Sequence, residues 1–428
     1  MIAAASVGIF LTAYAFIATE KISRIAAALG GVAAMTVLGV IDVESAFFSL
    51  HTGIDWNVIF LLFGMMVIVS VLKQTGLFEC LALWAAAASR GDAKRLFVLI
   101  ALITAPLGAL LDSVTIVLLI APVTMAACRR IGVSSMPYLL VVVFAANIGG
   151  TATLIGDPPN IMIGSRADLS FTDFLVHTAP AAVLILAVVI PLCRLLFRRQ
   201  LVATRPAAAV AGSPRDAIKD PRRLAIGLVV LAAVMIGFGL HAALHLDPAV
   251  VAMLGAGAMV VLTGTSSEEF LEEVEWETLV FFMALFVLVG GLVNVGVVGK
   301  LGEFAVDSVG DQQLLVVTLL IFGSAVIGGL VDTIPYTAAM LPIVEQLVAS
   351  TSQTGADNPL WWAFALGADL SGNTTAVAAG ANVVVLGLAY KAGEPISFWQ
   401  FTKYGLVVTL VSLIIAWTYV WLRYFALA

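Results

Sequence analysis

Residues 145–164 (AANIGGTATLIGDPPNIMIG) interrupt a long apolar run and cannot continue it as one helix. Gly149 and Gly150 loosen the backbone, and Pro158 and Pro159 each remove a hydrogen-bond donor and collide with the preceding turn. We therefore expect a broken helix. Because lipid offers no partner to the freed backbone groups, such a break survives only inside protein or beside a polar cavity. In membrane proteins, breaks of this kind mark candidate binding sites.

The composition supports a membrane setting for this break. The chain has 428 residues, of which 61% are hydrophobic and 11% charged. Such a sequence is too apolar for a soluble protein and has room for about ten spans of about 20 residues. We expect an all-α polytopic membrane protein in contact with lipid. The three cysteines lie far apart, without metal-ligand spacing, and no basic patch with aromatics suggests nucleic acid. Neither a metal nor a cofactor is indicated.

Apolar stretches before the break predict spans and one short amphipathic helix, near residues 2–19, 25–41, 56–73 and 77–89. Residues 96–127 carry Asp112 between two prolines, so we expect a re-entrant helical hairpin with Asp112 and Ser113 at its tip. The broken helix covers 137–164, and another span follows near 174–195. Residues 198–223 are rich in Arg, Ala and Pro and are typical of a flexible cytoplasmic linker.

The same pattern returns after the linker, which predicts an internal duplication. Asp55-Trp56 matches Glu275-Trp276, and the tip residue Asp112 matches Asp332 at the same offset. Polar residues that recur in the same order, at nearly the same sequence offset, are not expected from chance. We therefore divide the chain into a first repeat over 1–197 and a second over 224–428, whose hairpin covers about 316–346 and whose broken helix covers 360–388.

Each repeat then has about five transmembrane helices, one of them broken, plus one hairpin. This odd number of crossings makes the two repeats inverted. With the N-terminus outside and the central linker cytoplasmic, every one of the 21 basic residues except Arg166, Lys300 and Arg423 lies on the cytoplasmic side. This bias follows the positive-inside rule and supports this orientation. We expect a multi-pass protein of the inner (plasma) membrane.

Four acids fall at membrane depth: Asp112, Asp157, Asp332 and Asp369. A charge there is costly and indicates function when it faces a cavity. Alternatively, each carboxylate caps a half-helix. Function is favoured for the symmetric tips, Asp112 and Asp332, whereas Asp157 leaves both readings open. Asp369 aligns with Asn147, so only one repeat carries a titratable group at this position. We take Asp112, Asp332 and Asp369 as the proton-coupling candidates.

Hydroxyls, amides and glycines around these acids form two similar candidate cradles for a solute or ion. The first comprises Ser113, Thr115, Asn147, Gly149, Gly150, Thr151, Thr153 and Asn160, and the second Thr333, Ser371, Gly372, Asn373, Thr374, Thr375 and Asn382. Any single serine or threonine more often joins neighbouring membrane helices.

The motifs LLDSVTIVLLIAPV (110–123), NIGGTATLIGDPPN (147–160), DTIPYTAAMLPIV (332–344) and LSGNTTAVAAGANVV (370–384) resemble the ion transporter superfamily. They are most similar to its arsenite/antimonite permease (ArsB) and P-protein branch, which is related to citrate-type and NhaD-type carriers. The resemblance implies a homodimer whose subunits combine a scaffold with an elevator-like transport domain. It also implies that the hairpin tips and helix breaks form the substrate and ion sites. Relatives usually carry asparagine where this chain has Ser113.

These features favour a secondary active transporter that exports arsenite or antimonite in exchange for protons. A sodium/proton antiporter is the main alternative. A citrate-like organic-anion carrier is weaker, because no arginine or lysine is expected in the cavity. A channel subunit working with a separate soluble ATPase stays open. An enzyme is disfavoured because neither a nucleotide-binding loop nor a nucleophile elbow is found.

Overall fold

The computed structural model describes residues 1–428 except 1, 20, 50–51, 203–213, 310–311 and 428. Among the described residues, eight helices are long and apolar enough to cross a membrane. They are α1 (Ile2–Thr19), α4 (Trp56–Gln74), α7 (Ser113–Ile131), α11 (Ala179–Leu196), α12 (Pro221–Leu244), α15 (Trp276–Asn294), α17 (Gln313–Val331) and α21 (Phe398–Trp421). The prediction of an all-helical polytopic membrane fold is confirmed.

Shorter helices complete the fold. Those over ten residues are α2 (Arg24–Val37), α5 (Leu77–Ser89), α6 (Ala93–Gly108), α8 (Met136–Gly150), α13 (Pro248–Thr263), α16 (Val297–Val309), α18 (Thr333–Ala349), α19 (Pro359–Ser371) and α20 (Gly380–Lys391). The remaining ones are α3 (Val43–Phe47), α9 (Pro158–Ala167), α10 (Phe171–His177) and α14 (Ser267–Leu271).

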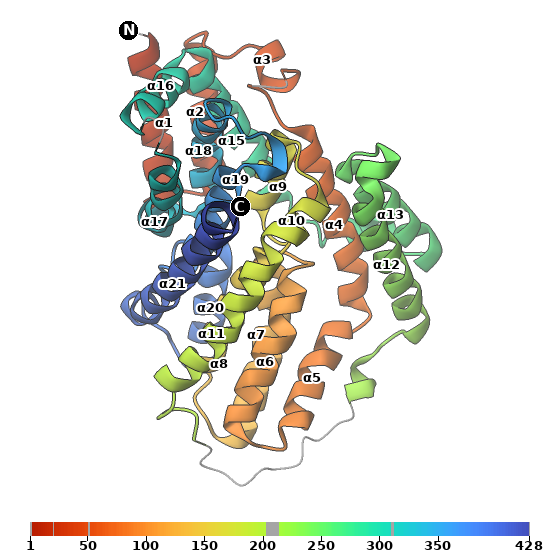
Figure 1. The fold of residues 1–428 in the computed structure, drawn as a ribbon. Helices are drawn as coiled ribbons and strands as arrows, with labels where there is room; N and C mark the ends of the chain where they lie inside the picture. Colours follow the sequence, from red (N-terminus) through yellow and green to blue (C-terminus); the bar gives the residue numbers. More distant parts are fainter. Residues whose placement is uncertain (1, 20, 50–51, 203–213, 310–311, 428) are drawn as a thin grey trace.

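The chain reverses at both expected hairpin tips. Helices α6 and α7 meet at residues 109–112, and α17 and α18 meet at Asp332. Figure 1 shows α6 and α7 in the lower half of the molecule and α17 and α18 in the upper half, so the tips approach the middle from opposite ends. By length and composition α7 and α17 could each cross a membrane. Whether the hairpins are re-entrant, and whether the repeats are inverted, therefore stay predictions.

Both broken helices are interrupted where expected, the first at glycines and prolines and the second at glycines. Helix α8 ends at Gly150 and α9 begins at Pro158, while α19 ends at Ser371 and α20 begins at Gly380. Tight packing against the hairpins requires glycine, because a Cβ on Gly149 would lie 2.0 Å from the carbonyl oxygen of Ala105 in α6. Glycine thus brings the backbone of α8 directly against the first hairpin.

The helices pack mainly within two groups. The frame group comprises α1, α2, α4, α12, α13 and α15, and the hairpin group comprises α6 to α9, α11 and α17 to α21. They meet where α4 contacts α9, α1 contacts α17 and α15 contacts α18. Inside the frame group, helices from the first half of the chain pack on helices from the second half: α4 packs on α13, and α2 packs on α15.

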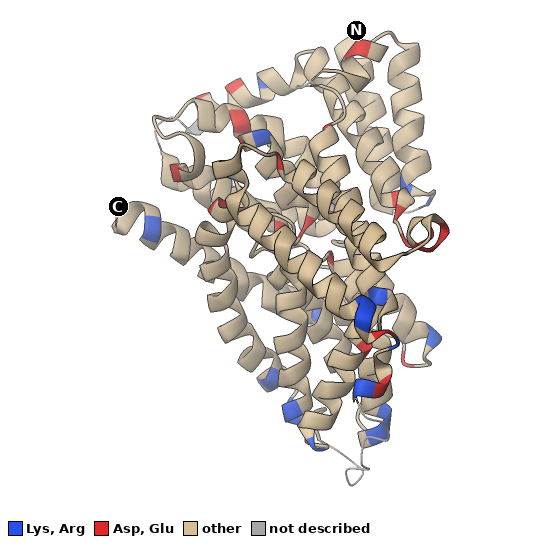
Figure 2. Ribbon diagram, turned by 90° about the vertical axis from the view of Figure 1, so that its right-hand side faces the viewer, with Lys and Arg blue, Asp and Glu red and all other residues tan. Residues whose placement is uncertain are grey.

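The linker prediction needs a correction at its C-terminal end. Residues 203–213 lie outside the described residues. Pro214–Ala217, however, form a short 3₁₀ helix packed on α5, the Lys219 N–H donates to the Thr75 carbonyl at 3.0 Å, and α12 begins at Pro221. This end of the segment is docked because glycine at position 76 lets the chain approach closely: a Cβ there would lie 1.9 Å from the Ala217 carbonyl oxygen. Figure 2 shows lysines and arginines gathered toward the lower end of the molecule.

Candidate functional site

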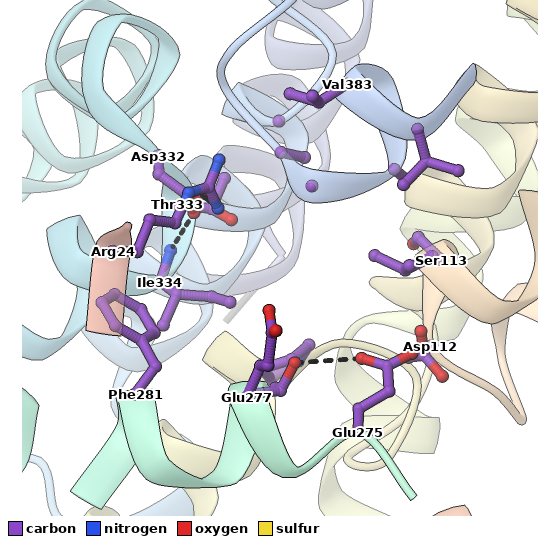
Figure 3. A pocket seen from close by; sticks show the side chains of 18 of the residues that line it. Arg24, Asp112, Ser113, Glu275, Glu277, Phe281, Asp332, Thr333, Ile334 and Val383 are labelled. Carbon is purple, nitrogen blue, oxygen red and sulfur yellow. Dashed lines mark hydrogen bonds and ion pairs between the residues drawn. The ribbon is translucent and has the colours of Figure 1, made fainter. Parts of the chain in front are cut away.

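A cavity of about 610 Å³ lies where the two hairpin tips and both helix breaks meet. Seven of the candidate residues line it: Asp112, Ser113, Asn147, Asp157, Asp332, Thr333 and Gly372. Figure 3 shows Asp112 and Ser113 on one side and Asp332 and Thr333 on the other, with Glu275 and Glu277 projecting from α15. The cavity is thus built by both groups of helices.

The tip aspartates cap their helices and line the cavity at the same time. The Asp112 carboxylate accepts the Thr115 N–H at 2.8 Å, and the Asp332 carboxylate accepts the Ile334 N–H at 3.0 Å. A carboxylate at a helix N-terminus is held by free N–H groups and the helix dipole. Asp157 precedes α9 without a capping bond among the described residues, and its side chain also lines the cavity. Asp112 and Asp332 therefore cap a helix and line the cavity at the same time, so one role does not exclude the other.

The expectation that no basic residue lies in the cavity is wrong. Arg24 lines it, and its Nη1 lies 2.7 Å from Oδ2 of Asp332. The Asp332 side chain is 2% exposed and that of Arg24 is 27% exposed. Among the described lining residues Arg24 is the one basic side chain, facing Asp112, Asp157, Asp332, Glu275 and Glu277. The site is therefore acidic with a single internal cation.

Glu275 is a site residue that the sequence analysis did not include among the candidates. It precedes α15 and accepts hydrogen bonds from Thr278 at 3.0 Å and Thr115 at 3.4 Å. It lines the main cavity and an adjoining one of about 210 Å³, as Asp112 does. The repeat alignment pairs Glu275 with Asp55, the N-cap of α4, which predicts its position before α15 but not its position at the cavity.

Two asparagines hold the helix breaks in the same way. The Asn160 side-chain amide donates to the carbonyls of Gly150 (3.3 Å) and Thr153 (3.0 Å). The Asn382 amide donates to the carbonyls of Gly372 and Thr375, at 2.7 and 2.8 Å. In addition, Thr153 and Thr375 donate to carbonyls of their own hairpins, at Ala109 and Gly329. These matched bonds tie each break to the neighbouring hairpin.

Buried oxygens without a partner gather around the breaks. Both carboxylate oxygens of Asp369 are buried and have no hydrogen-bond partner among the described residues, and the same holds for Oδ1 of Asn147, Asn160 and Asn382 and for Oγ of Ser113. Asn147 Nδ2 donates to Asn373 Oδ1 at 2.9 Å, which joins the two breaks. Unpaired buried acceptors are costly, so this cluster is suited to a proton or cation.

Other candidate residues hold the local backbone. The hydroxyls of Thr151 and Ser371 donate within their own helices, to Ile148 and Ala368. Thr374 donates to Thr409 of α21 at 3.4 Å. Gly149 and Gly150 permit close packing, and Thr115 lies at the smaller cavity. In the described part of the chain, no three His, Cys, Asp or Glu side chains are placed to hold a metal ion.

A family model described as a citrate transporter matches residues 14–367, which is most of the chain. The chain belongs to this citrate transporter family. The resemblance to the ion transporter superfamily is therefore confirmed, and the protein is a membrane transporter and not an enzyme.

Curated relatives and solved structures agree with this assignment. An uncharacterized transporter of Mycobacterium tuberculosis is 48% identical, over 99% of both chains. The human P protein is 32% identical over 95% of this transporter and 58% of its own length. The crystal structure of the Alcanivorax borkumensis YdaH transporter matches with a TM-score of 0.59 at 14% identity, covering 85% of this chain and 84% of that one. At 14% sequence identity, this match supports a similarity of fold alone.

Proposed function

We propose that this chain is a proton-coupled secondary active transporter with its exchange site in the 610 Å³ cavity. One observation carries the proposal: the carboxylates of Asp112, Asp157 and Asp332, from three separate elements, converge on that cavity. Like charges repel strongly where water is scarce. Protons or other cations must therefore neutralise part of the cluster, and their exchange for the solute supplies the coupling. Asp369, buried behind the cavity, completes the set of proton-coupling candidates.

The solute that we propose first is arsenite or antimonite, moved outward. Arsenite is mostly an uncharged trihydroxide at neutral pH. Its hydroxyls can donate to carboxylate and amide oxygens, and the cavity offers both kinds without a surplus of cations. Unpartnered oxygens at Asn147 and Ser113 add acceptors at the wall of the site.

Arg24 favours a second candidate, a citrate-like organic anion. A guanidinium binds carboxylates through two parallel hydrogen bonds, which makes arginine the usual partner of such solutes. Arg24 lies in the cavity, and the family model is described as a citrate transporter. Against this candidate stand five carboxylates in the same cavity, which would repel an anion unless cations neutralise them.

The division into two helix groups supports an elevator-type movement. The hairpin group carries both tips and both breaks, and its main direct contacts with the frame group are α4 with α9, α1 with α17 and α15 with α18. Helices α5, α10 and α16 belong to neither group and contact both. In this proposal the hairpin group moves against the frame group and carries the solute with it. The frame group would form the contact between subunits of a homodimer. A channel subunit energised by a separate ATPase would not need such a division.

The orientation is part of the proposal. Most basic residues gather toward one end of the molecule, together with the described ends of the linker (Figure 2). By the positive-inside rule this end faces the cytoplasm of the plasma membrane, and the N-terminus then lies outside.

Proton movement in everted vesicles tests the proposal. Vesicles carrying the wild-type chain are acidified, and the lumenal pH is followed while arsenite, antimonite, citrate, sodium and lithium are added in turn. We expect arsenite or antimonite to release protons. A response to citrate alone would select the second candidate, one to sodium or lithium alone would select a cation antiporter, and no response to any of them would refute proton coupling.

Charge-removing variants connect the response to the cavity. We expect Asp112→Asn and Asp332→Asn to abolish the response while the protein is still expressed. Asp307→Asn, on the exposed surface of α16, is the matched control and should respond as the wild type does. Full activity in both cavity variants would remove these aspartates from the mechanism.

A further inference from the structure

The Arg24–Asp332 ion pair joins the two helix groups across the cavity (Figure 3). Arg24 is the first residue of α2, which packs on α1 and α15 of the frame group. Asp332 sits at the tip between α17 and α18, in the hairpin group. Any movement that carries the second hairpin away from α2 must therefore break this pair.

Breaking the pair is unfavourable while Asp332 is ionised. The Asp332 carboxylate is almost fully buried, with its second oxygen held by the Ile334 N–H. Separating a buried carboxylate from its cation leaves an uncompensated charge, which is strongly destabilising. A proton on Asp332 removes that charge and with it the penalty for separation.

We propose that the Arg24–Asp332 pair is an interlock that lets the hairpin group move only when a proton has replaced Arg24 at Asp332. The inference rests on the proposed proton-coupled exchange. The proton adds to the Asp332 carboxylate, and Arg24 remains a cation at the cavity wall. The interlock prevents the hairpin group from moving when it carries neither solute nor proton. Solute movement and proton movement therefore stay linked.

Several other titratable groups line the cavity or lie close to Asp332, and they define the setting in which it titrates. They are Tyr14 of α1, Asp112 before α7, Asp157 before α9, Glu275 and Glu277 at the start of α15, and Tyr336 of α18. None of these groups carries a positive charge, whereas Arg24 does, and its charge competes directly with a proton for the Asp332 carboxylate.

The pH dependence of exchange separates the interlock from an anion-binding role for Arg24. With the purified full-length chain in proteoliposomes, Arg24→Gln should move the pH of half-maximal exchange upward by at least one unit, a tenfold change in proton concentration. The KM for solute should stay constant, and Arg24→Lys should restore most of the wild-type profile. A raised KM with an unchanged pH profile would overturn the interlock and make Arg24 a solute anchor.

A second ion pair provides the matched control. Arg166 Nε lies 2.9 Å from Glu345 Oε2, and this pair joins α9 to α18 within the hairpin group. Because both partners move together, Arg166→Gln should leave the pH profile as in the wild type. An equal shift in both variants would show a general charge effect and would also overturn the interlock.

Distance measurements test the interlock without relying on transport. Spin labels on Leu240→Cys in α12 and Leu319→Cys in α17, both exposed positions, report the separation of the two groups in a background without native cysteines. We expect one narrow distribution at alkaline pH and a second population at acidic pH, with Arg24→Gln showing both populations throughout. Identical distributions in wild type and variant would refute the interlock. If the distances respond but no solute moves protons, the proposed function fails while the interlock stands.

Discussion

Replacing Asn160 or Asn382 with alanine should destabilise the protein by similar amounts. Each asparagine amide donates two hydrogen bonds to buried backbone carbonyls at its helix break, at distances between 2.7 and 3.3 Å. Alanine leaves the Gly150 or Gly372 carbonyl without this donor, which costs about 1–3 kcal/mol. The carbonyls of Thr153 and Thr375 keep a second donor, the N–H of Gly156 or Ala378, so losing the asparagine bond there costs about 0.5–1.5 kcal/mol. We therefore expect each variant to lose about 1.5–4.5 kcal/mol in the free energy of unfolding.

One compensating effect places the loss toward the lower end of that range. The Oδ1 atoms of both asparagines are buried and have no partner among the described residues, so alanine also removes a costly acceptor. Because the bonding pattern is the same in the two halves of the chain, the two variants should agree to within about 1 kcal/mol, the usual spread of a hydrogen bond's contribution.

Denaturant titration of the detergent-solubilised protein, followed by tryptophan fluorescence, measures these values. Asn57→Ala, at an exposed position on α4, is the matched control and should change the free energy of unfolding by less than about 0.5 kcal/mol. Losses below 1 kcal/mol in both site variants would refute the idea that the amides hold the breaks. A large loss in only one variant would refute their equivalence.

Three further predictions concern the same region. Gly149→Ala should cost about 3 kcal/mol in thermal or chemical unfolding, since its Cβ would lie 2.0 Å from a backbone oxygen, whereas Gly323→Ala, with open space around it, should be neutral or slightly stabilising. Asp369→Asn keeps the shape of this buried side chain but cannot take up a proton, so it should stop proton exchange in vesicles; retained exchange would exclude Asp369 from coupling. Thr115→Val removes a donor to Glu275 and should slow exchange without loss of expression, and an unchanged rate would argue against a role for the adjoining cavity.

The helix breaks and hairpin tips could be predicted because backbone chemistry determines them. Glycine and proline in an apolar run leave few alternatives to a break, and an aspartate before a new apolar stretch is a typical helix N-cap. The structure accordingly ends α8 at Gly150 and begins α7 after Asp112. These local rules need no knowledge of how distant segments pack.

Arg24 and Glu275 could not be placed by the same rules. A charge at the end of an apolar run is normally assigned to the membrane surface, and Glu275 closes a run of acidic residues. Both positions reach the cavity through tertiary packing, because α2 is only 14 residues long and the start of α15 lies at the first hairpin tip. The side-chain partner in each case, Asp332 or Thr115, is more than 150 residues away in sequence.

The packing between the two halves of the chain in the frame group has a consequence for folding during synthesis. Helix α4 packs on α13, and α2 packs on α15, so each half of the chain covers its partner's apolar faces. During synthesis, α2 and α4 enter the membrane well before α13 and α15 exist. The first half must therefore wait in the membrane with these faces against lipid, and neither half completes its packing alone. A gene divided at the linker should give a working protein only when both fragments are produced in the same cell.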